Sequence, residues 1–278
     1  LVVIVFTVTL VVAMYSTLAE RKIAGFMQDR HGPDRAGIFG ILQPLCDGGK
    51  FFFKEEIIPA GAHKSLFILG PVIAIITACI SSAVIPWGQN LVIDGKTITL
   101  QVADVNIGVL YVFGVIALGV YGIMLGGWAS NNKFSLMGAI RAASQSISYE
   151  IGMGLSLIAL LMVTGTLQLG EIVAQQSGFM NWNIWVQPLG FLIFITCAFA
   201  ECNRVPFDLP ECETELVGGY HTEYSSMKLG LYMFSEYINM FVSSALMSAL
   251  YFGGYNFPFM YDLGLSENWI TIIGVLVF

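Results

Sequence analysis

Six acidic side chains gather in one polar segment between residues 201 and 228. They are Glu201, Asp208, Glu211, Glu213, Glu215 and Glu223. Neighbouring carboxylates repel one another, so one of them holds a proton more readily than an isolated carboxylate does, and such groups suit proton exchange. A solvated acidic loop would share this composition, but Pro206, Pro210 and the aromatic residues between the acids indicate an ordered segment. We therefore interpret the segment as the beginning of a proton path.

Two further glutamates, Glu150 and Glu236, lie inside long apolar stretches. A charged side chain at the centre of a membrane costs at least ~2.5 kcal/mol on insertion scales, so it normally faces a polar interior. Gln145 and Ser146 lie about one helical turn before Glu150 and give it a polar face. A protonated structural glutamate is the alternative to a proton relay. With Glu201, these residues predict three carboxylates along one side of the membrane, which favours a path over a single site.

The polar stretch 20–35 interleaves acids and bases directly after an apolar run. A basic membrane anchor would explain the bases alone. The acids Glu20, Asp29 and Asp34 would not strengthen attraction to anionic lipid. The pattern favours a surface that pairs with another protein or lines a polar cavity.

The composition requires a membrane around most of the chain, because 56% of the 278 residues are hydrophobic and only 11% are charged, against about 25% charged in soluble domains. A helix crosses the hydrocarbon core with about 20 apolar residues. An amphipathic piece from Phe39 to Phe53 predicts an interfacial helix in the first cytoplasmic loop. We expect an all-α, polytopic transmembrane bundle of about seven spans, at 1–19, 66–86, 107–127, 138–164, 188–200, 229–253 and 268–278.

Every basic residue except Lys96 falls in the segments 20–65, 128–141 and 201–228. By the positive-inside rule these segments face the cytoplasm or the mitochondrial matrix, and the N-terminus lies on the opposite side. The sequence begins and ends within apolar runs, at Leu1 and Phe278. We expect a single membrane domain over 1–278, trimmed at both termini.

The remaining composition excludes several classes of protein. The five cysteines show no C-x-x-C spacing and no histidine lies inside an apolar run, which argues against zinc, iron–sulfur and bis-histidine haem sites. The formal net charge of −7 argues against nucleic acid as a partner.

Several strings, in their order along the chain, resemble a membrane subunit of NADH:quinone oxidoreductase (respiratory complex I), called chain 1 in mitochondria and the H subunit in bacteria. They are E-R-K-I-A-G-F-M-Q-D-R-H-G-P, L-Q-P-L-C-D-G-G-K-F-F-F-K-E, G-W-A-S-N-N-K-F-S-L-M-G-A-I-R-A, S-Y-E, A-E-C-N-R-V-P-F-D-L-P-E, G-Y-H-T-E-Y-S-S-M-K and S-E-Y. Together they cover essentially the whole chain. The full family member has eight spans, so the resemblance implies one more than the apolar runs show here.

The resemblance implies a function at the junction of the membrane arm and the peripheral arm. The family forms the chamber that a quinone enters from the bilayer, and it couples quinone reduction to proton translocation. It holds no redox centre of its own: iron–sulfur clusters and FMN belong to partner subunits, and quinone is a bound substrate. The implied partners are the peripheral subunits at the quinone site, the neighbouring small membrane subunits and membrane lipid.

Residue by residue, the resemblance implies three groups of site residues. The proton relay would contain Glu150, Glu201, Asp208, Glu211, Glu213, Glu215 and Glu236. The quinone chamber would be bordered by Arg21, Gln28, Arg30, Asp47, Glu223 and Tyr224. Arg141 and Arg204 would act as charge partners. Cys202 and Cys212 depart from the family, which more often has threonine and a small residue there, and neither change should end function.

Three other interpretations stay open. The chain could be the cognate subunit of a membrane-bound hydrogenase or of a coenzyme F420-oxidising complex, since the electron donor is not encoded in it. A stand-alone proton or ion transporter is compatible with the buried glutamates, although such a protein needs no charged docking face. A pure scaffold is the third. We expect an energy-coupling membrane, with the bacterial plasma membrane favoured by the stretch 182–188 and the mitochondrial inner membrane as the alternative; the choice between ubiquinone and menaquinone stays open.

Overall fold

The computed structural model describes residues 1–93, 96–211, 213–258 and 266–278. Each of the seven predicted spans is a helix in it. Their bounds are α1 Val2–Met27, α3 Lys64–Ser81, α4 Gly108–Ala129, α5 Lys133–Thr164, α8 Pro188–Glu201, α10 Ser226–Tyr251 and α11 Glu267–Val277.

By length and composition, four helices of the described chain are able to cross a membrane: α1, α3 with the 3-10 turn that follows it (η2, Ser82–Val84), α4 and α5. The α-helical membrane bundle predicted from the sequence is therefore confirmed. Crossing by the charged α10 and by the shorter α8 and α11 stays a prediction.

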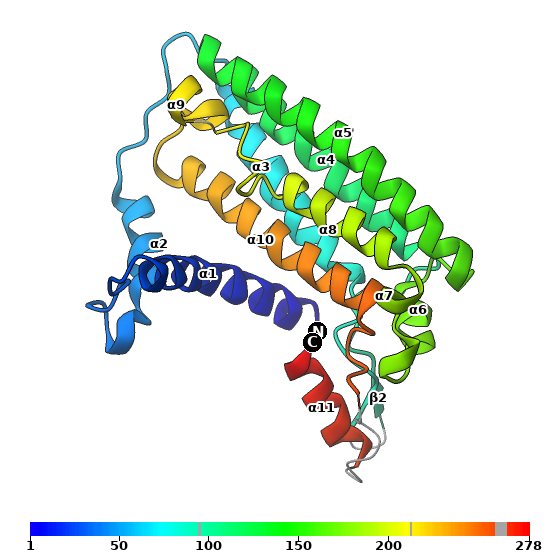
Figure 1. Ribbon diagram of the computed structural model, residues 1–278. Helices are drawn as coiled ribbons and strands as arrows, with labels where there is room; N and C mark the ends of the chain where they lie inside the picture. Colours follow the sequence, from blue (N-terminus) through cyan, green and yellow to red (C-terminus); the bar gives the residue numbers. More distant parts are fainter. Residues whose placement is uncertain (94–95, 212, 259–265) are drawn as a thin grey trace.

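Helices α3, α4, α5, α8 and α10 run side by side as the bundle (Figure 1). The α3–α4 contact is close because small residues face each other there, as is typical of membrane helix interfaces. A Cβ on Gly122 would lie only 2.8 Å from the carbonyl oxygen of Gly70. One apolar cluster fills the space between α5, α8 and the end of α10, and a second surrounds Phe67, Tyr220 and Tyr232.

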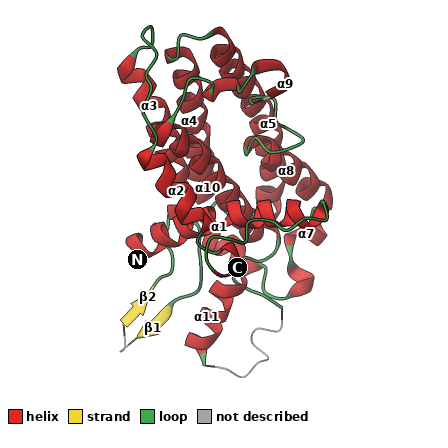
Figure 2. Cartoon of the chain, turned by 90° about the vertical axis from the view of Figure 1, so that its left-hand side faces the viewer, coloured by secondary structure: helices red, strands yellow, loops and turns green. Residues whose placement is uncertain are grey.

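The two ends of the bundle differ in structure (Figure 2). One end carries the acidic segment, with α9 and the 3-10 turn η4. The opposite end carries a small antiparallel hairpin and several short helices, none of which the sequence predicted. The bounds of these elements are α9 Glu213–Leu216 and η4 Gly219–His221 at the first end, and β1 Leu91–Ile93, β2 Lys96–Ile98, α6 Leu169–Gln175, η3 Phe179–Asn181 and α7 Asn183–Val186 at the other.

Helix α1 packs on α10 at the edge of the bundle, and α2 (Gln43–Phe53) lies beside it (Figure 1). The predicted amphipathic helix is present, but it begins at Gln43 rather than at Phe39. A separate 3-10 turn, η1 (Ile38–Gly40), precedes it. Phe39 and Gly40 have φ angles of 55° and 76°, in the left-handed region that a right-handed helix cannot continue through.

Candidate functional site

A small cavity inside the bundle is lined by two of the predicted relay carboxylates. Glu201 is the last residue of α8 and Glu236 lies on α10, and both line a cavity of about 30 Å³. Its other polar walls include Ser146, Asn203 and Ser235. Water needs roughly 10–15 Å³ and several polar partners, so this cavity has room for one or two molecules. Both residues therefore line a space large enough for water.

Glu236 is only 8% exposed, and its carboxylate has a direct partner. The Tyr220 hydroxyl donates a hydrogen bond to Glu236 Oε1 at 2.8 Å. Tyr220 lies on η4, which is seated against α5 because the Ser135 hydroxyl donates to the Tyr220 carbonyl oxygen at 2.8 Å. Burial and the charges of Glu236 and Glu211 raise the pKa of Tyr220 well above its usual value, so this phenol stays neutral.

Gln145 on α5 fixes the chain where α8 ends and the acidic segment begins. Its side-chain Nε2 donates to the carbonyl oxygens of Ala200, at 2.8 Å, and Phe207, at 2.9 Å. Both contacts are buried or nearly so. The sequence analysis assigned Gln145 to a polar face beside Glu150. In the structure its side chain instead holds the acidic segment against α5.

The structure places the other relay candidates at different distances from the cavity. Glu150 is half-buried on α5 and interacts electrostatically with Glu201. Asp208 and Glu211 interact in the same way with Glu236. Glu215 instead forms an exposed ion pair with Arg141, with 2.6 Å between Oε2 and Nη1.

Cys212 and the side chain of Glu213, both named in the sequence analysis, lie outside the described residues. Cys202, by contrast, is buried and forms part of the cavity wall.

Arg204 connects the acidic segment to α1. Its Nη1 lies 3.5 Å from Glu20 Oε1, and its guanidinium stacks over the Tyr237 ring with 4.3 Å between guanidinium carbon and ring centroid. The Tyr237 hydroxyl donates to the other oxygen of Glu20 at 2.8 Å. Arg204 also interacts electrostatically with Glu236. One cation therefore stands between a surface carboxylate of α1 and the buried carboxylate of α10.

Of the residues predicted to border a quinone chamber, Arg21 and Asp47 meet across α1 and α2. Arg21 Nη1 lies 2.5 Å from Asp47 Oδ2, Gln43 donates to Oδ1 at 3.1 Å, and Lys50 lies 3.5 Å away. Burial raises the pKa of Asp47, but the hydrogen bonds from Arg21 and Gln43 and the nearby positive charges outweigh it, so the pKa lies below its usual value. Two more of these six residues lie just beyond the end of α1, where Arg30 Nε donates to Gln28 Oε1 at 2.7 Å.

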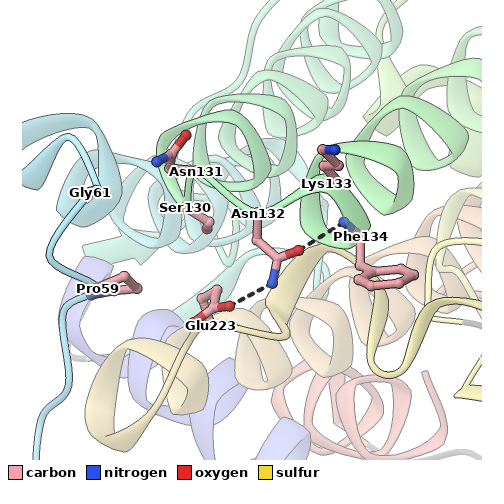
Figure 3. Close-up of a pocket in the computed structure, with 8 residues that line it drawn as sticks. All are labelled: Pro59, Gly61, Ser130, Asn131, Asn132, Lys133, Phe134 and Glu223. Atoms are coloured by element: carbon pink, nitrogen blue, oxygen red, sulfur yellow. Dashed lines mark hydrogen bonds between the residues drawn. The ribbon is translucent and has the colours of Figure 1, made fainter.

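Glu223 and Tyr224 occupy a different place, beside the beginning of α5. A pocket of about 330 Å³ is formed there by Pro59, Gly61, residues 130–134 and Glu223 (Figure 3). Asn132 Nδ2 donates to Glu223 Oε1 at 2.5 Å. Tyr224 is buried, stacks on Phe67 with ring centroids 4.1 Å apart, and its burial raises its pKa to about 12.

The pocket and α2 are connected through the chain at the beginning of α10. The Ser226 hydroxyl donates to the carbonyl oxygens of Phe51 and Lys54, both at 2.9 Å. Lys228, two residues further on, pairs with Glu56. Among the residues that the structure describes, no group of three or more His, Cys, Asp or Glu side chains is arranged to hold a metal ion.

Comparison with known proteins assigns the family. A family model described as NADH dehydrogenase matches residues 1–278. The chain is 70% identical over 274 residues to an H subunit of NADH-quinone oxidoreductase from Cytophaga hutchinsonii, covering 99% of this chain and 80% of that protein. The chain belongs to the family of NADH-quinone oxidoreductase H subunits. The resemblance inferred from the motifs is thereby confirmed, and this member of the H-subunit family is an integral membrane protein.

More distant relatives agree with that assignment. The H subunit of NADH-quinone oxidoreductase from Flavobacterium johnsoniae is 62% identical over 278 residues, with 99% of this chain and 79% of that protein covered. An H subunit from Geobacter metallireducens is 49% identical over 257 residues, with 92% and 78% covered.

Several residues of the site in this H-subunit family member were not among the predicted site residues, although Gln145 and Glu20 were noted in the sequence as polar neighbours. Tyr220 bonds to Glu236, Gln145 holds the acidic segment, and Glu20 with Tyr237 surrounds Arg204. The available signal was their position beside predicted acids and bases: Tyr237 follows Glu236 directly, and Glu20 precedes Arg21. The pairing of these residues depends on how the acidic segment runs, which no local pattern fixes.

Proposed function

We propose that the chain is a membrane-arm subunit of a proton-translocating NADH:quinone oxidoreductase. In that enzyme it would border the quinone chamber and couple quinone reduction to proton transfer among buried carboxylates. Its curated relatives are named as subunits of that enzyme. It would act as one membrane domain over 1–278, in contact with the peripheral subunits at the quinone site and the neighbouring small membrane subunits. Because these relatives are bacterial, we place it in the plasma membrane.

The observation that carries this proposal is the small cavity lined by both Glu201 and Glu236. Buried carboxylates are costly in a membrane bundle unless they have polar partners. Here two of them share a space fit for water, with Glu150 interacting from α5. The arrangement supports proton transfer in which one carboxylate releases a proton to bridging water and the other accepts it.

The quinone would be handled at the cytoplasmic side of α1 and α2. Arg21 and Asp47 form a fixed ion pair there, and Gln28 with Arg30 adds donors just beyond the end of α1. Arginine N–H groups and a glutamine amide can hydrogen-bond quinone oxygens. Glu223 and Tyr224 would border the same chamber from the segment tied to α2. Quinone binds as substrate, and the electrons come from the clusters and flavin of partner subunits.

The function is tested by neutral replacement of the relay carboxylates in the intact complex. Glu201→Gln and Glu236→Gln should each abolish proton translocation in proteoliposomes, because glutamine keeps the shape but cannot exchange a proton at working pH. The matched control is Glu171→Gln, on α6 at the opposite end of the bundle, where the exposed carboxylate accepts a local hydrogen bond from Thr166. Full pumping in both relay variants would refute the proton path.

The alternatives make different predictions for partners and for the isolated chain. An NADH-oxidising flavoprotein in the purified complex supports the proposal, whereas a nickel–iron catalytic subunit or a coenzyme F420-oxidising subunit would reassign the chain to a related complex. Robust proton flux by the chain alone in liposomes would support an independent transporter.

A further inference from the structure

One neutral side chain, Tyr220, makes the hydrogen bond that links the η4 turn of the acidic segment to Glu236. Tyr220 is fully buried and its ring packs edge-on against Tyr232, with centroids 5.2 Å apart. It is also part of the wall of the cavity that Glu201 and Glu236 share. A phenol that stays neutral can donate a hydrogen bond to a carboxylate without competing for its proton.

The backbone of η4 is wedged into the bundle, so the Tyr220 hydroxyl has little freedom. Ser135 on α5 bonds to its carbonyl oxygen. A Cβ on Gly138, one turn further along α5, would lie 2.5 Å from the Tyr220 nitrogen, so only glycine leaves room there. Gly219, directly before Tyr220, has a φ of 62°, a conformation that glycine adopts without cost.

The same segment carries the charges that act on Glu236. Asp208, Glu211 and Arg204 all interact electrostatically with it. Glu211 lies 3.8 Å from His221, the residue after Tyr220. Displacing the segment would therefore change the hydrogen bond and the surrounding charges of Glu236 together.

We propose that Tyr220 is a positioning residue that holds the Glu236 carboxylate in its cavity-facing geometry, so that proton exchange between Glu236 and Glu201 depends on the seating of η4 against α5. This inference rests on the proposed proton path. The hydrogen bond from the Tyr220 hydroxyl fixes the orientation of the Glu236 carboxylate. The contacts of η4 with Ser135 and Gly138 on α5 fix the position of that hydroxyl in turn.

The test compares Tyr220→Phe with Tyr251→Phe in the intact complex. Both tyrosines are fully buried, but Tyr251 lies in the other core cluster, on α10 and 15 residues beyond Glu236, which is about 22 Å by helical rise. The first readout is the carboxylic-acid band in redox-induced infrared difference spectra, assigned to Glu236 by its disappearance in Glu236→Gln. The second is the ratio of protons translocated to quinone reduced.

In Tyr220→Phe we expect the assigned band to shift and the proton-to-quinone ratio to fall severalfold, since a hydrogen bond to a charged group changes an equilibrium on the order of ten-fold. Tyr251→Phe should leave both unchanged. Ser135→Ala removes the hydrogen bond to the Tyr220 carbonyl oxygen but leaves the Tyr220 hydroxyl and the Glu236 carboxylate unchanged, and it should shift the band in the same direction.

An unshifted band and ratio in both Tyr220→Phe and Ser135→Ala would overturn the inference. The proposed function fails in a separate way, through normal pumping in Glu236→Gln.

Discussion

Asp47 on α2 and Glu236 on α10 are both acidic residues on helices, yet their surroundings are opposite. Asp47 contacts two bases and an amide at the membrane surface. Glu236 is buried beside a phenol and a small cavity, and two of the three charged groups that act on it from the acidic segment are themselves acids. The bases and the amide beside Asp47 hold its pKa below its usual value and so favour its charged form. Glu236 has fewer bases around it, as the proposed proton exchange requires.

The largest effect that sharpens this contrast should come from Gln145→Leu. The change leaves the Phe207 carbonyl oxygen without its Gln145 donor, at a cost of about 1–3 kcal/mol. The midpoint of thermal inactivation of the purified complex should fall accordingly, and pumping should fall with it. The control is Gln175→Leu, where an exposed side chain bonds to Thr164 and the change should stay within about 0.5 kcal/mol. Equal midpoints would show that the acidic segment is held by other contacts.

Arg204→Gln is expected to have the next largest effect. It removes an arginine–tyrosine stack and a partly exposed ion pair, together worth about 1–2 kcal/mol after allowance for solvent screening. Hydrogen exchange at residues 202–211 should accelerate, because the segment loses its link to α1. Unaltered exchange there would mean that α1 and the acidic segment are not coupled through Arg204.

Asp47→Asn tests the ion-paired carboxylate of this comparison. Loss of the partly exposed pair should lower the free energy of unfolding by about 0.5–1 kcal/mol. Since the pKa of Asp47 is lowered in the folded protein, its stabilising effect is full above its unfolded pKa of about 3.9 and is lost as pH falls through the folded pKa. The stabilities of Asp47→Asn and the unmodified protein should therefore differ at neutral pH and converge in acid. A constant difference across pH would contradict the assignment.

Arg141→Gln should have the smallest effect. Both members of its pair with Glu215 are substantially exposed, so the loss should be below about 1 kcal/mol and should shrink further in high salt. Pumping should persist. A large loss of pumping would show that Glu215 acts with the buried relay carboxylates and is not merely an exposed surface acid.

Much of the fold follows from the sequence because apolar runs of sufficient length have few alternatives in a membrane. The short fifth span at 188–200 appears as α8, with one more residue. The sequence analysis placed the beginning of the amphipathic helix too early, at Phe39. No residue pattern indicates that the backbone of Phe39 adopts a left-handed conformation. Within the site, the sequence could not separate Glu211, which acts on Glu236, from Glu215, which faces outward. That difference arises from the path of a proline-containing segment and from contacts such as Glu20 with Arg204, 184 positions apart.

The short length of α8 has an electrical consequence. Its 14 residues rise about 21 Å, against a hydrocarbon core of about 30 Å, and in the predicted topology Glu201 stands at its cytoplasmic end. If α8 crosses the membrane as predicted, the polar acidic segment takes the place of hydrocarbon over the remaining distance. The transmembrane voltage, worth about 2.3 kcal/mol per charge per 100 mV across the full membrane, would then fall mainly along α8. On the proposed proton path, a proton that reaches Glu201 from the cytoplasm would have crossed only a minor part of the voltage.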